Sequence, residues 1–70
     1  MAGWQTVNGE RLRELRLQRM LSQSELAKMA GTTQATISLF EGGQRTAQPR
    51  TVRKLADALG VEPRDLLDLP

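Results

Sequence analysis

The sequence predicts an all-α fold, a bundle of five short helices with short connections. Three observations support this class. Apolar residues recur three or four positions apart, as they do on one face of a helix. Glycines and prolines, which end or begin helices, separate the apolar segments at Gly31, Gly42–Gly43, Pro49, Gly60 and Pro63. No segment alternates between apolar and polar residues with period two, so we expect no strand.

The first predicted elements are a flexible lead and a helix. Residues 1–8 are expected to be loose, because Gly3 and the pair Asn8–Gly9 disfavour regular structure. Within this lead, Trp4 is interpreted as a hydrophobic anchor and not as a ligand contact. A helix is expected over 9–19, with two leucines facing the core. The folded domain is expected to cover residues 9–69.

The last two predicted helices follow a polar loop. Pro49 suits the first turn of a helix, because its missing N–H costs nothing there. Four apolar residues line one face of this helix over 49–59, and a glycine ends it. Pro63 begins a fifth helix over 63–67. Leucines near the C-terminus either form a dimer surface or close the core, and both alternatives stay open. They are Leu66, Leu67 and Leu69.

Composition excludes several function classes. Seventy residues form one small domain, and they include no cysteine and no histidine. Thiol chemistry, disulfides and the commonest metal ligand are therefore absent. The carboxylates form no convergent pair, so we expect no enzyme, no cofactor and no metal site. No apolar run approaches the roughly 20 residues that span a bilayer. The N-terminus lacks the apolar block of a signal peptide, so a cytoplasmic protein without a membrane partner is expected.

The distribution of charge gives a weaker indication of the partner. The formal net charge is only +2. Arginines gather in the first predicted helix and again after residue 44, whereas carboxylates concentrate near the C-terminus. This asymmetry would orient the molecule on a polyanion. An ordinary solvated surface of mixed charge explains it equally well.

Residues 22–40 carry the most informative pattern. Ser22 is a good N-cap, and Glu25 stands three residues later, so the two form a capping box. The apolar residues that follow predict a helix over 23–30. Gly31 ends this helix, because glycine adopts a left-handed backbone without steric cost.

A second helix follows directly after this turn. Thr33 caps a helix over 34–41. The spacing of Ala27, Gly31 and Ile37 fits a helix-turn-helix, in which the alanine permits a close crossing and the isoleucine fills the gap. A second helix held in this way commonly reads the major groove of DNA.

A helical projection of residues 34–41 places a short, uncharged set of side chains outward or at the margin. They are Gln34, Ala35, Thr36, Ser38 and Leu39. Gln34 can bond adenine through N6 and N7, and the methyl groups of Ala35 and Leu39 suit the thymine methyl. Thr36 and Ser38 can reach a phosphate or a base edge.

Phosphate contacts are expected on both sides of this helix. The helix that begins after Ser22 offers free backbone N–H groups, and Gln23 adds an amide donor. Gln44 and Arg45 are placed to hold the DNA backbone on the far side. The alternative for Gln44 and Arg45 is an ordinary solvated loop.

Residues 9–67 resemble the DNA-binding domain of the phage-repressor and Cro type (Xre-like) helix-turn-helix proteins. Six segments carry the resemblance: LRELR at 12–16, LSQSELA at 21–27, AG at 30–31, TIS at 36–38, E-x-G at 41–43 and LADALGV at 55–61. The resemblance implies a five-helix, lambda-repressor-like domain of bacterial or phage origin. It also implies a homodimer on a palindromic operator that regulates transcription.

The resemblance also assigns roles to single residues. The base-contacting positions of the family hold Gln34, Ala35, Thr36 and Leu39. Its sugar-phosphate contacts fall on Ser22, Gln23, Ser38, Gln44 and Arg45. The family pairs Arg16 with Glu41 as a structural ion pair. This chain departs from the pattern at Ala47, where many members have proline, and in the lead that carries Trp4.

Two functions remain in competition. The leading hypothesis is a sequence-specific regulator that binds double-stranded DNA, a transcriptional repressor with helix 34–41 in the major groove. The alternative is a protein-interaction module, such as an antitoxin or anti-regulator, that uses the same scaffold for a protein partner. The small, uncharged outer face of helix 34–41 and an exposed Trp4 would suit the alternative.

Overall fold

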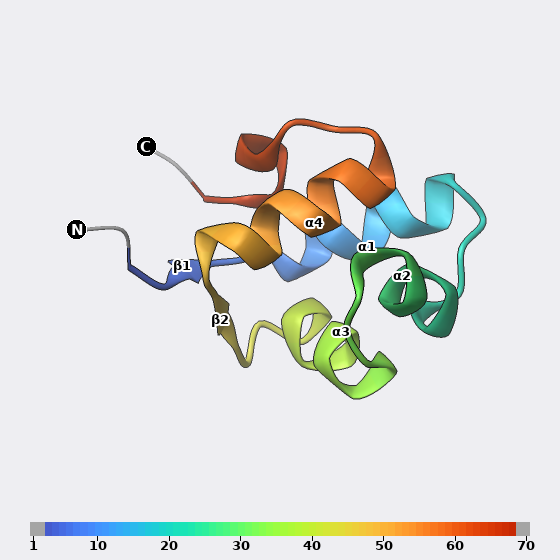
Figure 1. Cartoon of the computed structure of the whole chain (residues 1–70), viewed down its shortest axis with the longest axis horizontal. Helices are drawn as coiled ribbons and strands as arrows, with labels where there is room; N and C mark the ends of the chain where they lie inside the picture. The colour runs from blue at the N-terminus through green and yellow to red at the C-terminus, as the bar shows by residue number, and fades with distance from the viewer. Residues whose placement is uncertain (1–2, 69–70) are drawn as a thin grey trace.

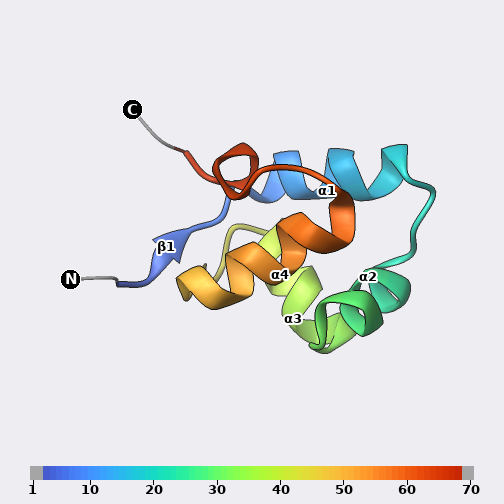
Figure 2. The ribbon, with the colours of Figure 1, turned by 45° about the horizontal axis from the view of Figure 1, so that its top comes forward.

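The computed structural model describes residues 3–68, and helices dominate them (Figure 1). The elements in chain order are β1 (Gln5–Thr6), α1 (Gly9–Gln18), α2 (Gln23–Ala30), α3 (Gln34–Glu41), β2 (Thr46–Ala47), α4 (Pro49–Leu59) and the 3-10 helix η1 (Pro63–Leu66). In both views α3 lies at the lower edge of the molecule and the chain after α4 returns above it (Figure 2). Among these residues no helix is long and apolar enough to cross a membrane.

The expectation of a purely helical chain is wrong in one place, because β1 and β2 form a short antiparallel pair. Gln5 stands opposite Ala47, and Thr6 stands opposite Thr46. Strands of two residues are too short to show the alternation by which strands are recognised in a sequence. Their pairing also joins segments about 40 residues apart, so no local signal announces it.

The expected fifth helix is a 3-10 helix and not an α-helix. Its hydrogen bonds span three residues, from Asp65 N–H to the Glu62 carbonyl and from Leu67 N–H to the Arg64 carbonyl. Leu67 then takes an extended backbone and pairs with Val7 as an isolated bridge. The helix therefore ends at Leu66, where the chain enters this bridge.

Leu66 and Leu67 pack in or against the core instead of forming a free surface. Leu66 is fully buried, and Leu67 packs partly buried against the core. The dimer alternative for Leu66 is therefore wrong. Leu69 lies outside the described residues.

The N-terminal lead reaches the core through Val7, whereas Trp4 lies outside the core. Val7 belongs to the core, and Asn8 caps α1 by accepting a hydrogen bond from the Arg11 N–H at 3.0 Å. Trp4 is 62% exposed and is not part of the core, which argues against its interpretation as a hydrophobic anchor. The domain boundary at residue 9 stays a prediction, although residues 5–8 are already ordered against the domain.

The turn between α2 and α3 follows the sequence expectation closely. Gly31 has a φ of +68°, the left-handed conformation that glycine adopts without strain. Ala27 is buried where α2 meets α3, and Ile37 is fully buried in the same core. These contacts hold α3 at a fixed angle to α2 while its other face stays outside the core.

Candidate nucleic-acid interface

The orientation of α3 is set by its cap and by two buried side chains. The Thr33 hydroxyl accepts a hydrogen bond from the Thr36 N–H at 3.2 Å, which starts the helix. Ile37 and Phe40 are buried on the inner face. The outward face is therefore exposed as the projection predicts. It consists of Gln34, Ala35, Ser38 and Leu39.

Thr36 stands at the margin of α3, and its hydroxyl already has partners. The Oγ1 atoms of Thr33 and Thr36 lie 3.0 Å apart. Arg45 Nη1 donates to Thr36 Oγ1 at 3.5 Å, and the Arg45 guanidinium lies 5.9 Å from the centre of the Phe40 ring. These contacts hold Arg45 beside α3. The role of Thr36 as a base reader stays a prediction, and its hydroxyl would have to exchange partners to fulfil it.

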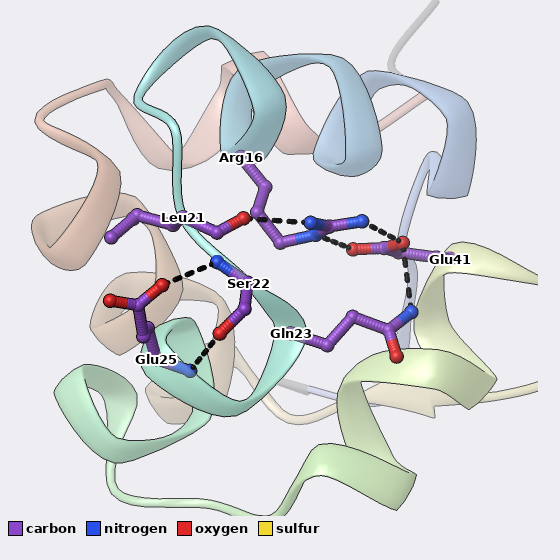
Figure 3. A network of polar contacts seen from close by, with 6 residues as sticks. All are labelled: Arg16, Leu21, Ser22, Gln23, Glu25 and Glu41. Atoms are coloured by element: carbon purple, nitrogen blue, oxygen red, sulfur yellow. Dashed lines mark hydrogen bonds and ion pairs between the residues drawn. The ribbon is translucent and has the colours of Figure 1, made fainter.

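The N-terminal end of α2 is capped by the side chains of Ser22, which precedes the helix, and Glu25 in its first turn (Figure 3). Ser22 N–H donates to Glu25 Oε1 at 2.8 Å, and Glu25 N–H donates to Ser22 Oγ at 3.0 Å. The hydrogen bonds from the Ser22 backbone and hydroxyl lower the pKa of Glu25 below its ordinary value of 4.5. A phosphate at this helix end would use the N–H groups that the capping box leaves free, those of Gln23 and Ser24.

Gln23 joins the start of α2 to the end of α3. Its Nε2 donates to Glu41 Oε1 at 3.1 Å, and the side chain is half-buried. An amide nitrogen carries two hydrogens, so one donor remains for a phosphate oxygen. The hydrogen bond to Glu41 holds the Gln23 amide, and with it this second N–H, in place.

Arg16 and Glu41 form the ion pair that the family resemblance implies. Arg16 Nε and Nη2 donate to the two oxygens of Glu41 at 2.6 and 3.1 Å, and Nη1 donates to the Leu21 carbonyl at 2.7 Å (Figure 3). The hydrogen bond to Glu41 raises the already high pKa of Arg16. One guanidinium therefore connects α1, the segment before α2, and the end of α3.

The end of α3 is also fixed by a close approach of α1. A Cβ added to Gly9 would lie 2.4 Å from the Glu41 carbonyl oxygen and 2.5 Å from that of Phe40. Only glycine fits there. Past this point Gln44 N–H donates to the Leu39 carbonyl at 2.9 Å, so the loop folds back on the helix and leaves the Gln44 side chain exposed.

These contacts divide the expected site residues into two groups. Gln34, Ala35, Ser38 and Leu39 share one exposed face, whereas Ser22 and Gln23 lie at the start of α2, and Gln44 and Arg45 follow α3. The sequence reasoning missed that Gln23 joins the Arg16–Glu41 pair. The spacing of 18 residues between Gln23 and Glu41 carries no periodic signal that could have revealed it. Within residues 3–68, no cluster of three metal-ligating side chains occurs.

Comparison with known proteins identifies the family to which the chain belongs. The HTH_3 helix-turn-helix family matches residues 12–66. A Bacillus subtilis protein, the uncharacterized HTH-type transcriptional regulator RghRB, is 45% identical over 60 residues, which are 84% of this chain and 43% of that protein. The control protein C.BamHI of Bacillus amyloliquefaciens is 38% identical over 86% of this chain and 75% of its own length. The putative antitoxin HigA2 of Mycobacterium tuberculosis is 42% identical over 80% of this chain and 56% of its own.

Solved structures show the same arrangement of helices. The restriction-modification controller protein C.AhdI from Aeromonas hydrophila is 44% identical, with a TM-score of 0.80 over 84% of this chain and 89% of that one. The P22 c2 repressor, solved in complex with a synthetic operator, is 31% identical, with a TM-score of 0.84 over 89% of this chain and 94% of that one. With residues 12–66 matched, the chain belongs to the HTH_3 family of helix-turn-helix proteins.

Proposed function

We propose that this chain is a sequence-specific DNA-binding domain that represses transcription as a homodimer. One observation carries the proposal: α3 presents an exposed, uncharged face of short side chains, with donors for phosphate on both sides. An α-helix with its side chains is about 10–12 Å in diameter, so it fits the major groove, which is about 12 Å wide. The likeness to a repressor solved with its operator supports the same docking.

We assign some residues to base contacts and others to phosphate contacts, as in most protein–DNA interfaces. Gln34 at the first turn of α3 would read a base pair, and Ala35 and Leu39 would contact thymine methyl groups. The free N–H groups at the start of α2, together with Gln23, would bind one strand's backbone. Arg45, held at α3 by Thr36 and Phe40, would bind a phosphate on the other side.

A homodimer would double this small interface. A single eight-residue helix with one amide reader discriminates only a few base pairs. Two copies related by a two-fold axis would place their α3 helices about 34–36 Å apart, in successive turns of the major groove. The site read by such a dimer is a palindrome.

Selection of bound sequences from a random 30-base-pair library tests the proposal. We expect a palindromic consensus whose half-sites are about 10 base pairs apart, with A·T pairs in the positions next to Gln34 and Leu39. Binding to the selected duplex should fall by about 10³ between 50 and 200 mM salt if roughly six phosphates are contacted by the dimer. Failure to enrich any sequence, with no retention of duplex at 50 mM salt, would contradict the proposal.

The second candidate function is that of an antitoxin-type module, and the similarity to the putative antitoxin HigA2 favours it. The exposed Leu39 and the uncharged face around it would then contact a protein. Such a contact would be mainly apolar and would change little with salt. The salt dependence of binding therefore separates the two functions. A chain that uses both partners would bind DNA more weakly as salt rises and would bind the protein partner almost equally at all salt concentrations.

A further inference from the structure

Trp4 lines two adjoining hollows at the edge of the molecule that carries β2. The first, of about 250 Å³, lies between Trp4, Thr36, Arg45 and the strand β2. The second, of about 290 Å³, lies between Trp4 and the first turns of α4, at Arg50 and Arg53. With 62% of its surface exposed, Trp4 is a large apolar side chain that the domain does not use for its core.

The position of Trp4 is fixed relative to α3. Trp4 precedes Gln5, which pairs with Ala47 in β2, and β2 follows α3 by a short loop. In Figure 1 the two strands lie side by side, and a short loop leads from the end of α3 to β2. Thr36 and Arg45 therefore lie on the shared border of the α3 face and the Trp4 hollows.

The residues that line the two hollows are basic or neutral, which suits the binding of a polyanion. Three arginines line the two hollows together with Trp4: Arg45 in the first, and Arg50 and Arg53 in the second. Threonine hydroxyls and the amide of Gln48 add neutral donors. Among the residues described, no carboxylate lines either hollow. An aromatic ring with an N–H at its edge, set among arginines, suits a sugar-phosphate backbone.

We propose that Trp4 and Arg50 form a further phosphate contact that extends the α3 interface along the DNA backbone. The indole Nε1–H donates to a phosphate oxygen, and Arg50 neutralises the same phosphate or its neighbour. The contact carries no base readout, so it strengthens binding to every sequence. The inference rests on the proposed DNA-binding function and adds residues that lie outside the helix-turn-helix.

A second copy of this chain is the competing occupant. A two-fold contact centred on Trp4 would bring the same patch of each copy together. Arg50 and Arg53 would then face their own counterparts without a carboxylate between them. This repulsion favours the DNA backbone over a self-contact.

The experiment uses the fact that Trp4 is the only tryptophan of the chain. Acrylamide quenching of its fluorescence is measured with and without a selected duplex and a scrambled duplex of the same length. Binding of both duplexes is measured for Trp4→Phe, Trp4→Ala and Arg50→Gln. Arg64→Gln, a charge change on η1, is the matched control. Thermal unfolding of each variant shows that the domain remains folded.

Both duplexes are expected to protect Trp4 from acrylamide at least roughly twofold. Trp4→Phe, which keeps a ring but loses the N–H, should weaken binding to both duplexes by about tenfold. Arg50→Gln should lower the salt slope by about one, and Arg64→Gln should change neither quantity. A wild-type protein that binds duplex with unchanged quenching, or a Trp4→Phe variant that binds as wild type, overturns the inference and leaves the proposed function standing.

Two further outcomes would also decide the question. Protection of Trp4 at high protein concentration without DNA would assign the hollow to a second copy and overturn the inference. Absence of duplex binding by the wild type would overturn the proposed function, and this inference would fall with it. Trp4→Ala is expected to lose at least as much affinity as Trp4→Phe.

Discussion

Glu41, the last residue of α3, receives two hydrogen bonds from Arg16 of α1, at 2.6 and 3.1 Å. The two side chains are only 6% and 10% exposed. Because Glu41 also accepts from Gln23 of α2, a single carboxylate ties the end of the proposed reading helix to two other helices. A charge pair that is largely shielded from water thus adds to the cap and the buried side chains that orient α3.

Removal of one partner should be costly, and removal of both should be tolerated. Glu41→Ala leaves the Arg16 guanidinium with only its hydrogen bond to the Leu21 carbonyl and is expected to cost about 3 kcal/mol of unfolding free energy. The double variant Arg16→Met with Glu41→Leu should recover at least half of that loss, because no buried charge remains. Urea denaturation at pH 7 measures both. A loss below about 0.5 kcal/mol in Glu41→Ala would show that the pair is effectively solvated.

Gly9→Ala should destabilise the domain through the end of α3. The new Cβ meets two backbone carbonyl oxygens at 2.4 and 2.5 Å, and backbone cannot move aside as a side chain can. We expect a loss of about 1–3 kcal/mol. Gly42→Ala is the control, because its Cβ would lie 3.4 Å from the nearest atom and its φ is −81°. Equal unfolding midpoints for the two variants would contradict the close approach of α1 and α3.

Met20→Gly should stabilise the domain. Met20 has a φ of +55° and is 90% exposed. The left-handed backbone therefore costs conformational free energy at this residue, and its side chain gains no packing that would offset the cost. The expected gain is roughly 0.5–1 kcal/mol, or a few degrees in the thermal midpoint. Met29→Gly, an exposed change within α2, should lose about 1 kcal/mol. The same sign for both substitutions would argue against a left-handed residue at position 20.

Glu25→Gln should reduce the acid sensitivity of the domain. The folded-state pKa of Glu25 lies below 4.5, so the charged capping box stabilises the fold fully above pH 4.5. This stabilisation disappears as the pH falls through the folded pKa. Glutamine keeps an acceptor at the same position but does not titrate. Thermal midpoints from pH 6 to pH 3 should therefore fall less in Glu25→Gln, and parallel curves would exclude a titrating cap.

The helical part of the fold was predictable because its signals are local. The capping box of Ser22 and Glu25, the stop at Gly31 and the inward spacing of Ile37 and Phe40 all act within a few residues. The same locality made the outward face of α3 predictable. The family resemblance added the Arg16–Glu41 pair, which residue patterns alone did not indicate.

The features that sequence reasoning missed depend on contacts between distant segments. The strand pair and the Val7–Leu67 bridge join residues about 40 and 60 positions apart. Trp4 and Leu66 are neighbours of these pairings along the chain, because Trp4 directly precedes β1 and Leu66 directly precedes the bridge residue Leu67. Gln23, the second partner of the Glu41 carboxylate, was missed for the same reason.

The base-reading role of α3 is the central claim, and Gln34→Ala tests it most directly. Sites are selected from one random library with the wild type, Gln34→Ala and Arg45→Ala. We expect Gln34→Ala to lose its preference at one base pair of each half-site, a change of about 1–3 kcal/mol. Arg45→Ala should keep the consensus and bind every sequence more weakly. An unchanged consensus and affinity in Gln34→Ala would contradict the assignment of α3 as the reading helix.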